Sequence, residues 1–151
     1  MKKVFIGSQL DGIKFGAGPG CTFLYFLHYK NQEPDLMWLN IEVNKFIILP
    51  KNSGNLPKYN EKMDELDEEE SIKRILEIRR EEIVDISLGD TSPHLFITFK
   101  SGKVLFVNGY DKNFECWQAG DGEGYGGHEW LIVAVPGNEI AVWAPKDFQI
   151  T

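Results

Sequence analysis

The sequence predicts an α+β fold, a predominantly antiparallel β-sheet with one main helix, and three observations support this class. Short runs rich in β-branched and aromatic residues recur along the chain, and they are too short to form good helices. Clusters of Gly, Pro, Asn and Asp separate these runs and are typical of turns. Only residues 71–83 place apolar side chains at the three- and four-residue spacing of an amphipathic helix.

Each expected strand is an apolar run bounded by such turn residues. The hairpin with the clearest signal passes through Lys-Ser-Gly-Lys at residues 100–103. A second turn, Pro-Gly-Asn-Glu, occupies residues 136–139. We expect roughly seven to nine strands. The runs are residues 22–29, 36–43, 46–49, 83–88, 95–99, 104–107, 114–119, 130–135 and 140–143.

The composition is that of one globular domain spanning residues 1–151. This length fits the usual domain size of about 100–200 residues. A hydrophobic content of 42% and a charged content of 26% exclude a wholly disordered chain and a collagen-like or coiled-coil repeat. The net charge of −7 argues against nucleic acid as a partner, because a phosphate-binding surface needs clustered Lys and Arg.

Nearly all of the excess negative charge lies in or beside an expected loop-and-helix insertion at about residues 51–82. Residues 61–85 carry 11 acidic and 5 basic side chains, so this segment contributes −6 of the net −7. Ser71 is the expected cap of the helix, and the arginines Arg79 and Arg80 near its end agree with the helix dipole.

Six carboxylates at the start of this acidic segment are the candidate partner-binding residues. One interpretation makes them a solvated approach to the helix or a flexible loop. The other makes them a phosphate-mimicking surface for a basic partner, such as the active-site cleft of a nuclease, because complementary charge speeds association. The candidates are Asp64, Glu65, Asp67, Glu68, Glu69 and Glu70.

Two cofactor motifs begin in this chain but are not completed. Residues 120–127 contain a GxGxxG pattern, yet an expected strand follows where nucleotide binding requires a helix, and Asp121 and Glu123 would repel phosphate. The alternation from Asp111 to Glu115 opens like an EF-hand loop, but Cys116 stands where the loop needs glycine. We expect no cofactor, although a weak cation contact at Asp111 and Glu115 stays open as an alternative.

Nucleophilic and metal sites are not expected either. The three histidines are His28, His94 and His128, and none belongs to an HExxH motif. A triad could be drawn from Ser92, His94 and Asp111, or a pair from Cys116 and His128, but their spacing fixes no geometry. Because a GxSxG elbow is also absent, we expect no catalytic residue, no metal and no enzymatic activity.

Tryptophans are expected in the core or packed on a sheet face, and the cysteines are expected to be buried. The four tryptophans are Trp38, Trp117, Trp130 and Trp143. They supply large apolar area in or beside expected strands, and an alternative makes one or two of them interface anchors. Cys21 and Cys116 form no CxxC pair, so we expect both to be reduced and buried. Without a signal-like h-region or a long apolar run, a cytoplasmic location and no membrane contact are expected.

Residues 83–143 contain a series of short sequence motifs that are typical of β-hairpins. They include residues 94–99, 101–105, 108–111, 114–118 and 133–143. This half of the chain resembles small, mostly β immunity-type proteins of bacteria, the cytosolic partners encoded beside secreted polymorphic toxins. The resemblance implies a non-enzymatic protein that binds and blocks a toxin, and it brings no catalytic residues to carry over.

Charge and resemblance together favour a cytoplasmic, non-enzymatic binding protein, an immunity protein that neutralises a cognate bacterial toxin through its acidic surface. The alternatives are a structural or assembly module of a bacterial or phage particle, and a small-ligand-binding β domain. A secreted-toxin gene immediately upstream would favour the immunity protein, and a cluster of virion genes would favour the structural or assembly module.

Overall fold

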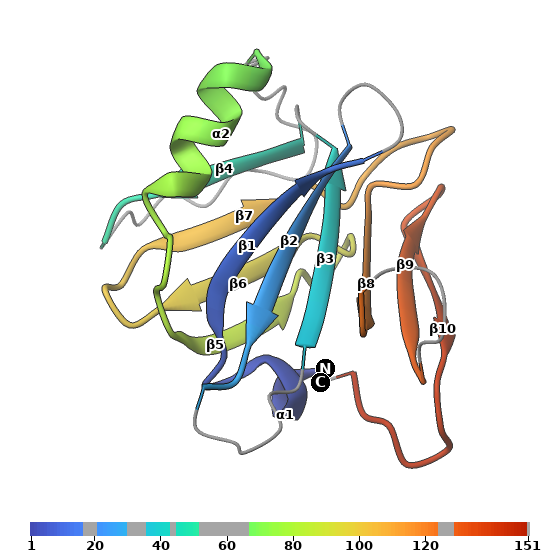
Figure 1. Cartoon of the computed structure of the whole chain (residues 1–151). Helices are drawn as coiled ribbons and strands as arrows, with labels where there is room; N and C mark the ends of the chain where they lie inside the picture. The colour runs from blue at the N-terminus through green and yellow to red at the C-terminus, as the bar shows by residue number, and fades with distance from the viewer. Residues whose placement is uncertain (17–20, 30–35, 43–44, 52–66, 124–128, 151) are drawn as a thin grey trace.

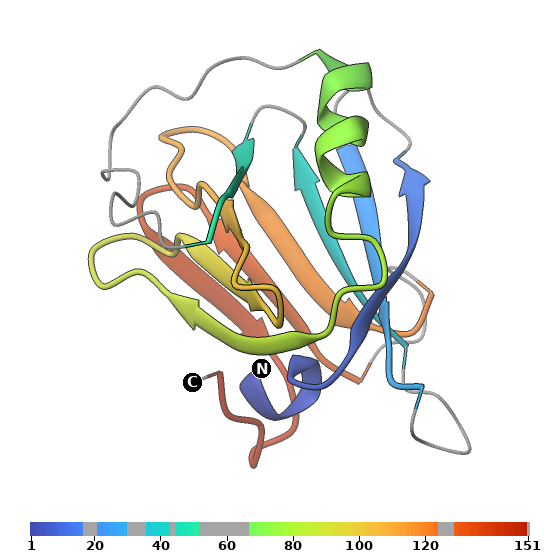
Figure 2. The same ribbon diagram turned by 90° about the vertical axis from the view of Figure 1, so that its left-hand side faces the viewer.

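The chain forms two antiparallel β-sheets that face each other, with the strands of one running across those of the other (Figures 1 and 2). The computed structural model describes residues 1–16, 21–29, 36–42, 45–51, 67–123 and 129–150. One sheet has six strands in the order β1-β2-β3-β8-β9-β10, and the other has four in the order β4-β7-β6-β5. All strand pairs are antiparallel, which confirms the predicted sheet type.

Ten strands and two helices are present among the described residues, and one of the helices has only four residues. Their bounds are α1 (Lys2–Phe5), β1 (Gln9–Phe15), β2 (Cys21–Leu27), β3 (Leu36–Glu42), β4 (Phe46–Leu49), α2 (Glu68–Leu76), β5 (Ile83–Leu88), β6 (Leu95–Phe99), β7 (Val104–Val107), β8 (Trp117–Asp121), β9 (Leu131–Val135) and β10 (Glu139–Trp143). The chain therefore builds three up-and-down units, β1-β2-β3, β5-β6-β7 and β8-β9-β10.

The core lies between the two sheets. Inward-facing residues alternate along the strands, as Leu24 and Phe26 do in β2 and Ile97 and Phe99 do in β6. The short helix α1 adds Phe5, whose ring meets the rings of Phe26 and Trp130 edge to face at 5.6 and 6.0 Å between centroids. The two ends of the described chain are adjacent, because the Met1 amine donates a hydrogen bond to the Gln149 carbonyl (Figure 1).

The helix prediction was right about the segment and wrong about its bounds. The helix spans Glu68–Leu76 instead of residues 71–83, and its N-cap is Asp67 instead of Ser71, which is buried. It does not continue to residue 83, because Arg80 takes a left-handed backbone with φ 63° and donates its N–H to the Leu10 carbonyl at 2.8 Å. An isolated bridge between Gln9 and Glu82 adds to this contact, so β1 of one sheet meets the approach to β5 of the other.

The ten strands exceed the seven to nine expected, and the short helix α1 was not predicted. Two of the strands differ from the sequence prediction for local reasons. Strand β1 was missed because Asp11 and Gly12 are residues that strands disfavour, and they lie at a bulge between Leu10 and Gly12. The expected strand at residues 114–119 begins instead at Trp117, and the Asp111 carboxylate holds residues 111–114 in a turn by accepting the N–H groups of Asn113 and Phe114. No helix in the described part of the chain is long and apolar enough to cross a membrane.

Candidate functional site

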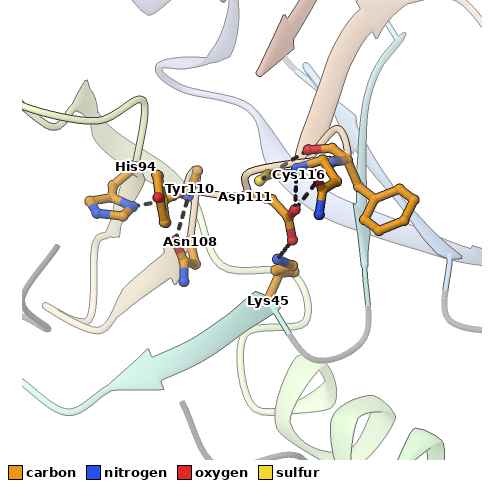
Figure 3. Close-up of polar contacts among 9 residues, drawn as sticks. Lys45, His94, Asn108, Tyr110, Asp111 and Cys116 are labelled. Atoms are coloured by element: carbon orange, nitrogen blue, oxygen red, sulfur yellow. Dashed lines mark hydrogen bonds and ion pairs between the residues drawn. The ribbon is translucent and has the colours of Figure 1, made fainter. Parts of the chain in front are cut away.

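The segment between β7 and β8, residues 108–116, connects the two sheets and is hydrogen-bonded along its length (Figure 3). The Asn108 N–H donates to the Lys45 carbonyl at 2.6 Å, and the Asn108 Oδ1 accepts from the Tyr110 N–H at 2.9 Å. The Gly109 N–H donates to His94 Nδ1 at 2.9 Å. A Cβ at Gly109 would lie 2.0 Å from the Pro93 carbonyl oxygen, so only glycine fits at this position. We call residues 108–116 the connecting loop.

Asp111 fixes the second half of the connecting loop. Its carboxylate accepts from Lys45 Nζ at 2.7 Å, from the Asn113 N–H at 2.8 Å and from the Phe114 N–H at 3.1 Å (Figure 3). Burial alone would raise the pKa of Asp111, but these three hydrogen bonds, with the charge of Lys45, lower the pKa below its usual value. The ion pair is largely shielded, since the Lys45 and Asp111 side chains are only 18% and 22% exposed.

The same loop presents an aromatic side chain to solvent. Phe114 is 65% exposed and Glu115 is exposed beside it, whereas Cys116 and Trp117, which follow, are buried. Trp117 secures this end of the loop, because its indole N–H donates to the Pro93 carbonyl at 2.7 Å. Phe114 is therefore an exposed aromatic residue on a backbone that its neighbours hold in one conformation.

A hollow of about 490 Å³ lies beside Phe114. Its polar lining is a chain of side chains across β3 and β8, in which Asn40 donates to Gln118 at 3.2 Å and Gln118 donates to Glu115. Glu115 is the one charged residue among the described residues that line it. The lining comprises Cys21, Asn40, Asn113, Phe114, Glu115, Cys116, Trp117, Gln118 and Pro136. A carboxylate, several amides and an exposed ring suit a cationic, donor-rich group such as a Lys or Arg side chain.

A larger cleft of about 800 Å³ lies where α1, the end of β8, the start of β9 and residues 145–149 come together. Its apolar part includes Trp130 stacked on Phe148, with centroids 5.1 Å apart. Four carboxylates and Lys3 also line it, and the carboxylates are Asp121, Glu123, Glu129 and Asp147. The Asp121 carboxylate already accepts the N–H groups of Glu129 and Trp130 at 2.9–3.1 Å, so it holds the backbone of this region.

Three of the predicted acidic residues that the structure describes make a cap or ion pairs within helix α2. Asp67 caps α2 by accepting the Glu70 N–H at 2.8 Å. Glu69 pairs with Lys73 at 2.9 Å and Glu70 pairs with Arg74 at 3.0 Å, both four residues apart on the helix. Glu68 is exposed and makes no ion pair with any described residue. Asp64 and Glu65 lie outside the described residues.

The hydrogen bonds described for Ser92, His94 and Asp111 go to residues outside this candidate triad. His94 Nδ1 accepts the Gly109 N–H, Asp111 pairs with Lys45, and the Ser92 hydroxyl donates to the Asn138 side-chain carbonyl. The His28 Nε2 donates to the Val4 carbonyl at 2.6 Å, while His128 and residues 124–127 of the glycine-rich pattern lie outside the described residues. The described residues contain no group of three or more His, Cys, Asp or Glu that could hold a metal ion.

Two predictions about buried residues need correction. Both cysteines are free thiols, but only Cys116 is buried, and Cys21 is partly exposed at the start of β2. Three tryptophans are in the interior as expected, whereas Trp143 is 58% exposed, because it lies on the last strand of the six-stranded sheet, β10.

Sequence reasoning missed Phe114 because residues 114–119 were assigned to a strand. The turn residues just before it, with Asn-Gly at 108–109 and Asp111 and Asn113, were the available signal for a tight loop. Searches of protein-family models, of curated proteins and of solved structures each gave no match to this chain.

Proposed function

We propose that this chain is a non-enzymatic binding protein that holds a basic segment of another protein at the hollow beside Phe114. In this proposal it is a cytoplasmic immunity protein, and the bound protein is a bacterial toxin. The single observation that carries the proposal is a 65% exposed Phe114 on the connecting loop, which Lys45, His94 and Asp111 hold in place.

A rigid exposed aromatic residue is a favourable anchor for a protein partner. Aromatic side chains are enriched in the cores of protein interfaces, where a few residues provide most of the binding energy. A loop that is already ordered loses little conformational entropy when the partner docks. Six of the hydrogen bonds that order the connecting loop are one from the Asn108 N–H, one to the Asn108 side-chain oxygen, one from the Gly109 N–H and three to the Asp111 carboxylate.

Charge favours a basic partner. The Glu115 carboxylate lies in the hollow and can accept a hydrogen bond from a cationic group, and the face of Phe114 can receive a cation. The net charge of −7 attracts a basic protein over a distance, and exposed Glu68 at the start of α2 adds to this field.

The immunity role rests on the resemblance of residues 83–143 to immunity-type proteins. These residues include β5 to β10 and the whole connecting loop, so the resembling part of the chain contains most of the proposed surface. An assembly module of a bacterial or phage particle and a small-ligand-binding β domain remain the alternatives, and the neighbouring genes distinguish the first of these from an immunity protein.

The test compares two exposed phenylalanines. A partner is isolated by pull-down from the producing strain and its Kd is measured for wild type, Phe114→Ala and Phe15→Ala, the last being a matched control with 61% exposure on β1. We expect Phe114→Ala to weaken binding by about thirtyfold or more, as an interface anchor does, and Phe15→Ala to change Kd by less than about twofold. Equal affinities for wild type and Phe114→Ala would reject this surface.

A further inference from the structure

Strand β10 leaves one edge of the six-stranded sheet without a neighbour among the described residues. It pairs with β9 in an uninterrupted register from Glu139–Val135 to Trp143–Leu131, and it is the last strand in the order of the sheet (Figure 1). Four of its five residues are apolar, and Val142 and Trp143 are 40% and 58% exposed. An edge of this kind offers unpaired backbone N–H and C=O groups beside apolar side chains.

The opposite edge of the same sheet has a bulge and a covering segment, which β10 lacks among the described residues, and it carries two exposed charges against the single Glu139 of β10. Strand β1 has a bulge between Leu10 and Gly12, and it carries exposed Asp11 and Lys14. Its first residues already pair with residues 80–82, which approach β5. Bulges, charges and covering segments are the usual devices that prevent edge-to-edge pairing. In the described part of the chain, strand β10 therefore lacks the bulge and the covering segment that interrupt the edge of β1.

We propose that β10 pairs antiparallel with β10 of a second copy of this chain, about a two-fold axis at Ala141. Only this register uses all five residues of the strand. Moving the axis to Ile140 would bring in Gly137 and Asn138, whose φ angles of 85° and 69° belong to the turn and not to a strand. Moving it to Val142 would bring in Pro145, which has no N–H to donate.

The register about Ala141 is complementary in side chains. Ile140 lies opposite Val142 of the second copy, and by symmetry this apolar pair occurs twice. Glu139 lies opposite Trp143 of the second copy, so the only charge on the strand never faces its own equivalent. Like charges directly opposite each other would destabilise the pairing, and this register has none.

The dimer is expected to be weak. Its affinity should also change with salt in the opposite direction from the affinity for a basic toxin. Pairing of five residues per copy is a small contact compared with the about 20–30 residues a side of a stable interface. Two chains of net charge −7 repel each other, and salt screens that repulsion. Added salt should therefore strengthen the dimer, whereas it should weaken the binding of a basic partner, so the two proposals can fail separately.

Sedimentation equilibrium of the purified protein at low and high salt tests the proposal. Wild type should dimerise in a concentration-dependent manner, and Ala141→Lys, which sets two lysines opposite each other, should raise the dimer Kd by at least about tenfold. Val84→Lys is the matched control, because Val84 is an exposed apolar residue on β5, at the edge of the other sheet, and its dimer Kd should not change. A wild-type protein that stays monomeric at every concentration and salt would overturn the proposal.

A cysteine pair tests the register. Directly opposite residues of antiparallel strands have Cα atoms about 4.5–5.5 Å apart, within disulfide reach. Ala141→Cys should therefore form a covalent dimer on mild oxidation, and Ile140→Cys, which faces Val142, should form much less, both in a Cys21→Ser background. Equal cross-linking of both variants would reject the register. Loss of a different protein partner in Ala141→Lys, with wild type monomeric, would assign the edge to that partner instead of a second copy.

Discussion

The ammonium group of Lys45 lies 2.7 Å from the carboxylate of Asp111, and this ion pair ties the start of β4 to the loop that presents Phe114. The two residues are 66 positions apart, and the ion pair adds to the backbone hydrogen bond that the Asn108 N–H donates to the Lys45 carbonyl. The same carboxylate accepts two N–H groups of the turn before Phe114, so one side chain organises both the contact between segments and the local turn.

Replacement of Asp111 should separate these two roles. Asp111→Asn keeps an oxygen for the Asn113 N–H and loses the charge, whereas Asp111→Ala loses both and leaves N–H groups unsatisfied. We expect the free energy of unfolding to fall by about 1–3 kcal/mol for Asp111→Ala and by less for Asp111→Asn. Urea denaturation at neutral pH measures both values, and equal losses in the two variants would contradict a role for the turn hydrogen bonds.

The contribution of Asp111 should also depend on pH. Its pKa in the folded protein is lowered from 3.8, so the folded state binds fewer protons than the unfolded state as pH falls. The stabilisation is therefore fully present above pH 3.8 and is lost as pH drops through the folded pKa. The difference in unfolding free energy between wild type and Asp111→Asn should shrink in acid, and a difference that stays constant down to the acid transition would contradict this assignment.

A methyl group at Gly109 should disrupt the connecting loop. In Gly109→Ala the new Cβ would lie 2.0 Å from the Pro93 carbonyl oxygen, so the backbone must move and the bond from the 109 N–H to His94 should be lost. We expect a loss of about 2–4 kcal/mol in unfolding free energy, from overpacking and an unsatisfied group together. Gly12→Ala is the control, because its Cβ would make an ordinary 3.6 Å contact with Tyr25. A Gly109→Ala protein as stable as the control would refute the packing argument.

Removal of the helix cap should weaken α2 without affecting the connecting loop. Asp67→Ala loses the hydrogen bond to the Glu70 N–H, and a lost N-cap typically costs about 1 kcal/mol, whereas Asp67→Asn keeps an acceptor and should cost less. Thermal unfolding followed by circular dichroism measures both variants. A change in the affinity of Asp67→Ala for a partner held at Phe114, without a change in stability, would mean that the start of α2 is itself a contact surface.

Local sequence signals predicted the strands whose burial alternates and whose turns are encoded nearby. Residues 95–99 and 104–107 are the clearest case, because a strand with alternating burial and an all-apolar strand flank a turn that contains Gly102 at φ 89°. The helix ended differently from the prediction because Arg80 bonds to Leu10, a contact that apolar spacing in residues 71–83 does not encode.

Local sequence signals could not predict the candidate site either, because it too depends on contacts between residues distant in the sequence. The connecting loop depends on Lys45 and His94, which are distant in sequence and carry no motif that links them to residues 108–116. The acidic run was visible in the sequence, but its use in capping and in pairs four residues apart follows from where the helix begins, at Glu68 instead of Ser71. Composition predicted the charge of the molecule and not the place where a partner would dock.

The long-range electrostatic attraction that Glu68 exerts on a basic partner can be tested separately from the ion pairs that stabilise α2. Glu68 makes no ion pair with any described residue, so Glu68→Lys changes the charge by two units while leaving the Glu69–Lys73 and Glu70–Arg74 pairs in place. We expect the association rate with a basic partner to fall by about two- to tenfold at low salt, because long-range attraction raises on-rates and salt screens it.

Asp90→Lys, the same charge change at an exposed turn between β5 and β6, is the control and should have a smaller effect if the location of the charge matters. Stopped-flow association at several ionic strengths measures both variants. Equal reductions would show that only net charge steers the partner, and no reduction in either variant would remove steering from the proposed function.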